Sequence, residues 1–486
     1  MRIAAICRKG LGNMRTRQAF HVSCGICSAL LLLFSQGTPA SAQTPSAQGP
    51  DVQQLTQQLQ RLENEIGQLK DQIKTLQQSQ NSNAGVSTAP QVQVSEDTPK
   101  APIERPPAEE EKKSTLDLYG FVMLDSGYDF KTNDPDWFDV VRPTKLPSAP
   151  GQFAPDGKVY FGVRQTRFGV KTATDTALGK LKTQFEFELF GTGVDAGQTT
   201  FRLRHAYGEL GAFGAGQTWS PFMDPDVFPN IVEYWGPTGM VFFRNVQFRW
   251  MPIRNDKTRL TFAVERPGAS ADGGVYADRI ELEGVRPKFD LPDFSWQARF
   301  IRKWGYIQVA GIFRKISWVD TGNATSAVPG RDVLGWGINT SSNVEMSKKD
   351  ILRLQVVYGE GIQNYMNDAP VDVSVKNTGN PNHPIEGVPL PVLGVVSFLD
   401  HTWSEQFTSS IGYSLENIDN SNAEKASDFH QGHYAIGNLL FHPIPKVTMG
   451  GEFQFGRRVN FKDGFNANDY RLQFSFKYDW GKTFEF

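Results

Sequence analysis

The stretch that decides the fold is Tyr470–Phe486, which reads YRLQFSFKYDWGKTFEF. Its even positions are aromatic or apolar, interrupted only by Lys482, whereas its odd positions are polar or charged apart from Gly481. Because successive side chains of a β-strand point to opposite faces, this segment has one aromatic face and one wet face. Such a pattern is typical of the strand that closes a transmembrane β-barrel, with its aromatic face turned to lipid.

Alternation of apolar and polar residues begins at Leu116 and returns throughout the rest of the chain. In one clear case, Phe185 and Phe187 share a face while Glu186 and Glu188 share the other. Further alternating segments are 260–264, 296–300, 352–358, 407–415 and 447–455. Since no helices are available to cover so many apolar faces, these faces must turn to lipid. The sequence therefore predicts an all-β membrane protein, an antiparallel transmembrane β-barrel.

Turn-rich inserts separate the predicted strands. The longest inserts are 127–157, 219–239, 319–331, 361–391 and 417–430. Outer-membrane barrels have short turns on one side and long loops on the other, and this spacing fits that plan. With membrane strands of ~9 to 11 residues, the barrel region 114–486 holds about 16 strands, and 18 strands is the alternative.

The overall composition fits a barrel better than a helical membrane protein. Hydrophobic residues make up 39% of the chain and the mean hydropathy is −0.40, which excludes a bundle of membrane helices. A barrel whose inner face is polar needs no more than this, and aromatic residues at 12% suit the girdles at its two rims. The net charge of −2 gives no basic excess that would suggest nucleic-acid binding.

Residues 1–42 have the features of an export signal. Basic residues come first, an apolar stretch at 29–34 follows, and a small-residue cleavage site ends at Ala42. The mature chain is expected to begin at about Gln43, with 43–50 as its N-terminus. All cysteines precede that cut: Cys7, Cys24 and Cys27. We expect no disulfide in the exported protein; lipidation of a cysteine is a weaker alternative, because the Leu-led context it needs is missing.

Residues 51–78 carry an unbroken heptad pattern. Its apolar positions recur at alternating intervals of three and four residues: Val52, Leu55, Leu59, Leu62, Ile66, Leu69, Ile73 and Leu76. A lone helix would expose this seam to water, so we expect a coiled coil through which copies of the chain associate, as a homotrimer if the barrel behaves as porins do. The next segment, 79–113, is rich in Ser, Asn, Gln, Pro and charge, and is expected to be a flexible linker.

Two arginines of the segment FRLRHAYG are candidate pore-lining groups. If Leu203 faces lipid, Arg202 and Arg204 point together into the lumen, one above the other. The alternative is that both arginines only pair with lumen carboxylates such as Glu186 and Glu188 on the preceding strand.

The same alternation places other residues of this segment on the lipid face. Phe201 and Tyr207 are apolar enough for that position, but His205 also falls on the lipid side. This placement is tolerable near an interface, or the alternation slips at a β-bulge.

Further strands contribute arginines at inward positions. These candidates are Arg249, Arg299 and Arg353, with Arg164 or Arg167 added from a segment where the alternation changes phase. A series of arginines in a narrow channel binds anions through paired hydrogen bonds and keeps its charge at any physiological pH. We therefore predict a preference for small anionic solutes.

The insert near 219–240 is too long and too apolar for a plain surface loop. An aromatic segment stiffened by prolines is able to fold back into the barrel and narrow the lumen. The candidate residues of this constriction loop are Trp219, Asp224, Asp226, Glu233, Tyr234 and Trp235. Its carboxylates would face the arginines across the lumen; the alternative is a loop that caps the outside or packs at a subunit interface.

Catalytic and metal-binding patterns find little support. An outer-membrane lipase needs a His-x-Ser arrangement on one strand, and no histidine of the barrel region has a serine two residues on. There is no phosphate-binding glycine loop and no Cys/His metal spacing, so we expect no cofactor, no metal and no enzymatic activity. Calcium binding at Asp129, Asp134, Asp136 and Asp139 is an alternative, but scattered loop acids are more often simply solvated.

Three segments carry a resemblance to a known family: LYGF at 118–121, RLRHAYGE at 202–209 and GQTWSPFMD at 216–224. Together with the export signal, heptads and linker, they resemble the DcaP family of trimeric outer-membrane porins. The resemblance implies a trimer of barrels with about 16 strands each. It also implies a periplasmic N-terminal coiled coil and passage of small anions such as dicarboxylates through an arginine-lined constriction.

The predicted location is the outer membrane of a Gram-negative bacterium, surrounded by its lipid, with the coiled coil in the periplasm. Phe486, which shares a face with Phe484, Trp480 and Tyr478, looks like the signal read by the barrel-assembly machinery. A sugar-specific porin is an alternative function, although most aromatic residues fall on the lipid face. A trimeric adhesin is a weaker one, since this chain has enough strands to close a barrel alone.

Overall fold

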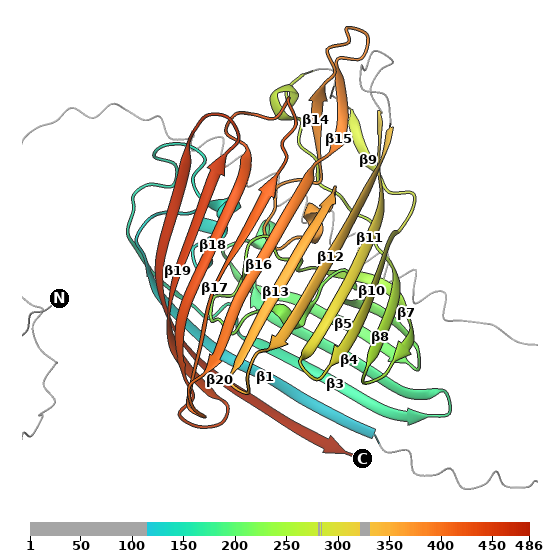
Figure 1. Ribbon diagram of the computed structural model, residues 1–486, viewed down its shortest axis with the longest axis vertical. Coiled ribbons are helices and arrows are strands. Elements are labelled where there is room, and N and C mark those ends of the chain that lie inside the picture. Colours follow the sequence, from blue (N-terminus) through green and yellow to red (C-terminus); the bar gives the residue numbers. More distant parts are fainter. Residues whose placement is uncertain (1–113, 280–281, 283, 321–330) are drawn as a thin grey trace, which may run out of the picture. The chain divides into compact units, whose positions relative to one another are not determined.

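The computed structural model describes residues 114–486 apart from 280–281, 283 and 321–330. These residues form an antiparallel β-barrel (Figure 1). The predicted signal, mature N-terminus, coiled coil and linker, which span 1–42, 43–50, 51–78 and 79–113, lie outside the described residues. In the part of the chain that is described, no helix is long and apolar enough to cross a membrane.

The main sheet contains 18 strands among the described residues. Its first half consists of β1 (Ser114–Asp129), β2 (Lys158–Gly162), β3 (Arg167–Thr176), β4 (Gly179–Phe190), β5 (Thr199–Leu210), β6 (Phe213–Trp219), β7 (Arg244–Arg254), β8 (Thr258–Glu265) and β9 (Val285–Lys288). Its second half consists of β10 (Asp293–Arg302), β11 (Gly305–Asp320), β12 (Arg331–Glu345), β13 (Asp350–Glu360), β16 (Pro391–Thr402), β17 (Phe407–Ile418), β18 (Phe429–Phe441), β19 (Val447–Asn460) and β20 (Asn466–Glu485). A separate hairpin is made by β14 (Val373–Asn377) and β15 (Ile385–Pro389).

Two of the 18 strands are pieces of interrupted wall strands. β2 pairs with the outer part of β1, whereas β3 pairs with its inner part, so the two follow one another along the same neighbour. In the same way, β9 pairs with the outer part of β11 and β10 pairs with its inner part. Counting each pair once leaves 16 strands around the barrel, which confirms the predicted fold and explains why 18 was a reasonable alternative.

The barrel closes between its first and last strands. β1 and β20 pair from Thr115 opposite Glu485 to Asp129 opposite Arg471. The outward side chains of β20 are large and exposed, as in Phe474 at 53% and Tyr478 at 48%, which is the face that lipid covers. The aromatic residues of the closing strand therefore face outward, as the alternation in the sequence predicted.

Connections differ in length at the two ends of the barrel, as Figure 1 shows. One end has tight turns, such as the turn from Arg302 to Gly305, and β20 ends on this side. Gly305 has φ 129°, and a Cβ atom there would lie 1.9 Å from the carbonyl oxygen of Asn343, so only glycine fits this turn. The other end carries long loops and the β14–β15 hairpin. By analogy with outer-membrane barrels we call the two ends periplasmic and extracellular.

The connection from β6 to β7, residues 220–243, turns into the barrel; we call it the inner loop. Its backbone is hydrogen-bonded by inward side chains from several wall strands. Asn339 of β12 donates to Phe222 O at 2.9 Å, and the Val232 and Glu233 amides donate to Glu452 of β19 at 3.0 Å each. These strands lie on different parts of the wall, so the loop is bound along much of its length.

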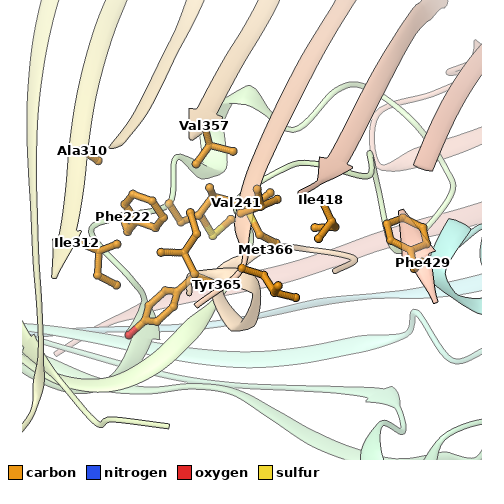
Figure 2. Packing of buried hydrophobic residues seen from close by; sticks show 13 residues of the cluster. Phe222, Val241, Ala310, Ile312, Val357, Tyr365, Met366, Ile418 and Phe429 are labelled. Carbon is orange, nitrogen blue, oxygen red and sulfur yellow. The ribbon is translucent and has the colours of Figure 1, made fainter. Parts of the chain in front are cut away.

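A small apolar cluster inside the barrel packs the inner loop against the wall (Figure 2). Phe222 and Val241 of the loop are fully buried against Ile312 of β11, Val357 of β13 and Tyr365. Fully burying side chains of this kind stabilises a fold by about 1.5–3 kcal/mol each. Short 3-10 turns shape the surrounding loops: η1 (Pro135–Trp137), η2 (Pro143–Lys145), η3 (Gly193–Asp195), η4 (Pro225–Val227), η5 (Gly274–Tyr276) and η7 (Gln363–Tyr365).

Candidate functional site

Four arginines converge on one carboxylate at the inner face of β4. The side chain of Glu188 is completely buried, and Arg204 binds it most closely. Arg167 Nη2 lies 3.3 Å from Glu188 Oε2, while Arg202 Nη1 and Arg244 Nη2 each lie 3.6 Å from Glu188 Oε1. These guanidinium groups come from β3, β5 and the start of β7.

A second carboxylate completes this group, which we call the arginine cluster: Arg167, Arg202, Arg204, Arg244, Glu186 and Glu188. Glu186 accepts a 2.6 Å hydrogen bond from Arg204 Nε and a 2.7 Å hydrogen bond from the Tyr119 hydroxyl. Four guanidinium groups face two carboxylates, so the cluster keeps an excess of two positive charges. Arginine does not lose its proton in proteins, and this excess is therefore permanent.

A bulge in β5 shapes the cluster and corrects one expectation. The pairing of β4 with β5 shifts register at Arg204, so that Glu186 lies opposite His205 and Phe187 opposite Leu203. The extra residue reverses the alternation beyond it. His205 is therefore buried on the lumen side, where its Nδ1 lies 3.0 Å from Thr218 Oγ1, and not in lipid.

The same bulge turns Tyr207 into the lumen, although the sequence predicted that it faces lipid. Its ring lies 5.2 Å from the guanidinium carbon of Arg249, which is an inward residue of β7. The bulge alternative, rather than an interfacial histidine, accounts for this segment.

The inner loop meets the arginine cluster through two aromatic residues. Tyr234 donates its hydroxyl proton to Glu188 Oε1, and Arg202 Nη1 donates to the same hydroxyl oxygen at 3.4 Å. The Tyr234 ring stacks on Phe190 at a centroid distance of 3.9 Å. Trp235 donates from Nε1 to the backbone oxygen of Asn367 at 2.7 Å. The loop is thereby fixed beside the charged groups.

A cavity of about 290 Å³ borders the cluster. Its walls include Arg202, Arg244, Tyr234 and the amide side chains of Asn364 and Asn367. The Arg202 side chain is 30% exposed, and Arg244 has a buried Nη1 without a hydrogen-bond partner within the described residues. The cavity therefore presents N–H donors and excess positive charge, which is what the oxygen atoms of an anion bind.

The other predicted arginines occupy different surroundings. Arg299 binds Asp224 at 2.5 Å and also Asp226, so two carboxylates of the inner loop hold one wall arginine. Arg353 binds Asp400 at 2.5 Å and donates to the backbone oxygen of Asp226. These two arginines anchor the inner loop to the wall.

Two further arginines differ in their partners. Arg164 lies between β2 and β3, where its side chain is 1% exposed and bound to Asp139 at 2.5 Å. Arg249 donates from Nε to Gln247 Oε1 at 3.0 Å and from Nη2 to Trp219 O, and within the described residues it has no carboxylate partner. Arg249 therefore adds a positive charge on the lumen side of β7 without a direct ion pair among the described residues.

Two of the predicted constriction-loop residues, Trp219 and Glu233, do not line the cavity as constricting groups. Trp219 is the last residue of β6 rather than part of the loop, because it still pairs with Arg244 of β7. Glu233 accepts hydrogen bonds from the Val141 amide at 3.1 Å and the Tyr434 hydroxyl at 3.0 Å. It joins two loops to the wall and does not face the cavity.

The acidic residues considered for calcium are not gathered into one site. Asp139 is bound to Arg164, and the Asp134 side chain accepts the Asp136 amide at the start of η1. Within the described residues, no group of three or more His, Cys, Asp or Glu side chains is placed to hold a metal ion.

Arg244 is the member of the cluster that sequence reasoning missed. It precedes the inward positions Asn245, Gln247 and Arg249, so simple alternation assigns it to the lipid face. It points to Glu188 because the inner loop returns to the wall at this residue and the strand has only begun. A basic residue directly after the apolar run Val241–Phe243 was the available signal.

Comparisons with known proteins agree with this architecture. The chain is similar to the outer membrane channel DcaP of Acinetobacter baumannii, with a TM-score of 0.62 and 20% identity over 76% of this chain and 97% of that chain. It is also similar to an anion-selective porin from Comamonas acidovorans, with a TM-score of 0.50 and 11% identity over 76% of this chain and 100% of that one. At these identities the likeness shows the fold. A comparison with curated protein sequences gives no significant match.

The family comparison carries further, because it covers most of the chain. Residues 51–479 match the family described as DcaP outer membrane protein. This match confirms the resemblance seen around Arg202–Asp224, the outer-membrane location and the expectation that the protein is not an enzyme. The chain belongs to the DcaP family of outer membrane proteins.

Proposed function

We propose that the protein is a passive outer-membrane channel for small anions, with the arginine cluster as its selectivity site. The observation that carries the proposal is the convergence of four guanidinium groups on Glu188, which leaves two positive charges in excess beside a cavity. Like charges placed so close repel one another, and a passing anion relieves that repulsion. Small dicarboxylates are the expected class of solute, because each carboxylate matches the paired donors of one guanidinium group.

Electrostatics of this size suit transit rather than tight binding. Two unit charges 4 Å apart attract by about 1 kcal/mol in bulk water and about 4 kcal/mol where the effective dielectric constant is near 20. A lumen narrowed by the inner loop lies between these limits, so an anion gains a few kcal/mol at most. That is enough to enrich anions over cations while still allowing release.

Several finer features belong to the same proposal. Residues 1–42 would be the export signal, 43–50 the mature N-terminus, 51–78 a periplasmic coiled coil that joins three copies, 79–113 a linker, and 114–486 the barrel with a constricting loop near 219–240. Support comes from the unbroken heptads of the sequence and from the relatives. The A. baumannii protein is described as an outer membrane channel and the C. acidovorans protein as an anion-selective porin.

The test is the reversal potential of the purified protein in a planar bilayer under a salt gradient of ~0.1 M, where the screening length is about 10 Å. We expect an anion-selective sign. The double variant Arg202→Gln/Arg244→Gln removes the excess charge, and the anion-to-cation permeability ratio is expected to fall about threefold or more. Glutamine keeps an amide donor but is shorter than arginine, and Arg167 and Arg204 remain to neutralise Glu186 and Glu188.

A matched control removes two arginines that do not belong to the cluster, Arg302 and Arg457. The Arg302→Gln/Arg457→Gln variant loses the same charge and should keep the wild-type selectivity. Cation selectivity of the wild type, or equal effects of the two double variants, would overturn the proposal. In that case the aromatic side chains Trp235, Phe242 and Phe243 of the cavity wall would favour a sugar-specific porin.

A further inference from the structure

A second cavity lies on the periplasmic side of the arginine cluster. It has a volume of about 360 Å³ and is lined by side chains of six adjacent wall strands, from β1 and β3 through β7. Its charged wall residues are Asp117, Lys171, Lys182, Glu209, Arg249 and Arg254. Four cations therefore face two carboxylates, and the cavity keeps positive charge of its own.

The two carboxylates of this cavity are already occupied. Glu209 binds Arg254 at 2.5 Å, and Asp117 accepts a 2.6 Å hydrogen bond from the Thr483 hydroxyl. Lys171 and Lys182 are exposed to the lumen and form no ion pair within the described residues; the Lys171 ammonium lies 4.8 Å from the Tyr119 ring. These two ammonium groups are therefore available to a solute.

Hydrogen bonds link the wall of this cavity to the arginine cluster. Thr218 of its wall lies 3.0 Å from His205 Nδ1, and His205 Nε2 lies 4.0 Å from Glu186 Oε1 of the cluster. Gln184, also on its wall, donates to the Tyr119 hydroxyl at 2.9 Å, and that hydroxyl donates to Glu186 of the cluster at 2.7 Å. The wall of this cavity is therefore bonded to the arginine cluster, on the periplasmic side of it.

We propose that this periplasmic cavity is a second, weaker binding site for small carboxylate anions, with Lys171 and Lys182 as its ligand-binding residues. The inference rests on the proposed channel function and adds a site to it. Guanidinium groups bind a carboxylate through two fixed, parallel hydrogen bonds, whereas an ammonium group on a flexible stem is strongly hydrated and binds as a point charge. Because its ligand-binding residues are lysines rather than arginines, the periplasmic cavity binds an anion more loosely than the arginine cluster does. An anion therefore passes from tighter to looser binding as it approaches the periplasm.

The test uses block of the channel current by the malonate dianion, added to one side of the bilayer at a time. Residues 114–486 contain no cysteine, so a Ser404→Cys substitution in a periplasmic turn, labelled with a reagent that cannot cross the bilayer, reports the orientation of the inserted protein. In the Lys171→Gln/Lys182→Gln variant, the concentration for half-block from the periplasmic side is expected to rise about fivefold at ~0.1 M salt. Half-block from the extracellular side is expected to change less than twofold.

The matched control is Lys303→Gln/Lys348→Gln, which removes the same charge from two exposed periplasmic turns outside the cavity. It should leave both concentrations unchanged. Equal shifts from both sides in the cavity variant, or an equal shift in the control, would refute the second site. If that site fails while Arg202→Gln/Arg244→Gln still reduces anion selectivity, the channel proposal stands without it. If neither pair of substitutions has an effect, both proposals are wrong.

Discussion

At the scale of single residues, Glu188 is as important as the arginines around it. Each of the four guanidinium groups lies within 3.6 Å of the Glu188 carboxylate. Without this carboxylate between them, the four positive charges would repel one another and would not assemble. A buried charge network of this kind contributes little to stability by itself, because removing charges from water costs about as much as their attraction returns. Its effect is to hold guanidinium groups at fixed positions in the lumen.

The Glu188→Gln variant tests this role. It keeps the shape of the side chain but raises the excess charge of the cluster from two to three. We expect the free energy of unfolding to fall by about 3–5 kcal/mol, because buried guanidinium groups lose their partner. We also expect anion selectivity to rise in the protein that folds.

Heat-modified gel mobility and reversal potentials measure the two effects. The control is Glu360→Gln at the extracellular end of β13, which is not part of the cluster. Selectivity that stays at the wild-type value in Glu188→Gln would mean that the cluster does not face the permeating ions.

At the scale of elements, the inner loop explains what the sequence could and could not predict. Period-two alternation placed Arg202, Arg204, Arg249 and Arg299 on the lumen side, because strand geometry alone determines which way they point. Alternation cannot predict partners that come from a loop, such as Asp224 for Arg299.

The sequence allowed a bulge in FRLRHAYG without placing it at Arg204, and alternation assigned Arg244 to the wrong face. A bulge adds one residue on one strand only, and nothing in FRLRHAYG marks where that residue lies. Arg244 depends on where a 220–243 loop rejoins the wall, which is decided by packing inside the barrel. The wall could thus be predicted from local pattern, whereas the site needed long-range contacts.

Phe222 is the residue on which the position of the inner loop depends most. Replacing this fully buried side chain by alanine in Phe222→Ala should cost about 3–5 kcal/mol of local packing. The loop then moves more freely, so we expect a larger single-channel conductance and faster entry of larger neutral solutes. Single-channel recording and liposome swelling measure these changes. Phe474→Ala, on the lipid face, is the control and should leave conductance unaltered; the same change in both variants would contradict the anchoring role.

At the scale of the whole molecule, closure of the barrel fixes which residues of β1 and β20 lie opposite one another, and this register can be tested. Ser126 lies directly opposite Phe474 across the β1–β20 seam, and both side chains point outward. Cysteines at Ser126→Cys and Phe474→Cys should therefore form a disulfide under mild oxidation. Ser126→Cys combined with Phe484→Cys should not, because that position pairs with Leu116, roughly 33 Å along the strand at ~3.3 Å per residue. Gel mobility with and without reductant distinguishes the two variants, and a cross-link in the second would disprove the register.

The seam between β1 and β20 also determines when the protein can fold. The Ser114 amide donates to Phe486 O at 2.8 Å, so the sheet is completed by the two ends of the described chain. Until the last strand arrives, both edges of the sheet present unpaired backbone groups, which invite aggregation in water and are costly in lipid. Contacts between such distant residues form slowly, because a long loop must close before they contribute. The wall can therefore close only after β20 has been made and exported, and the chain has to be kept apart from its neighbours during that interval.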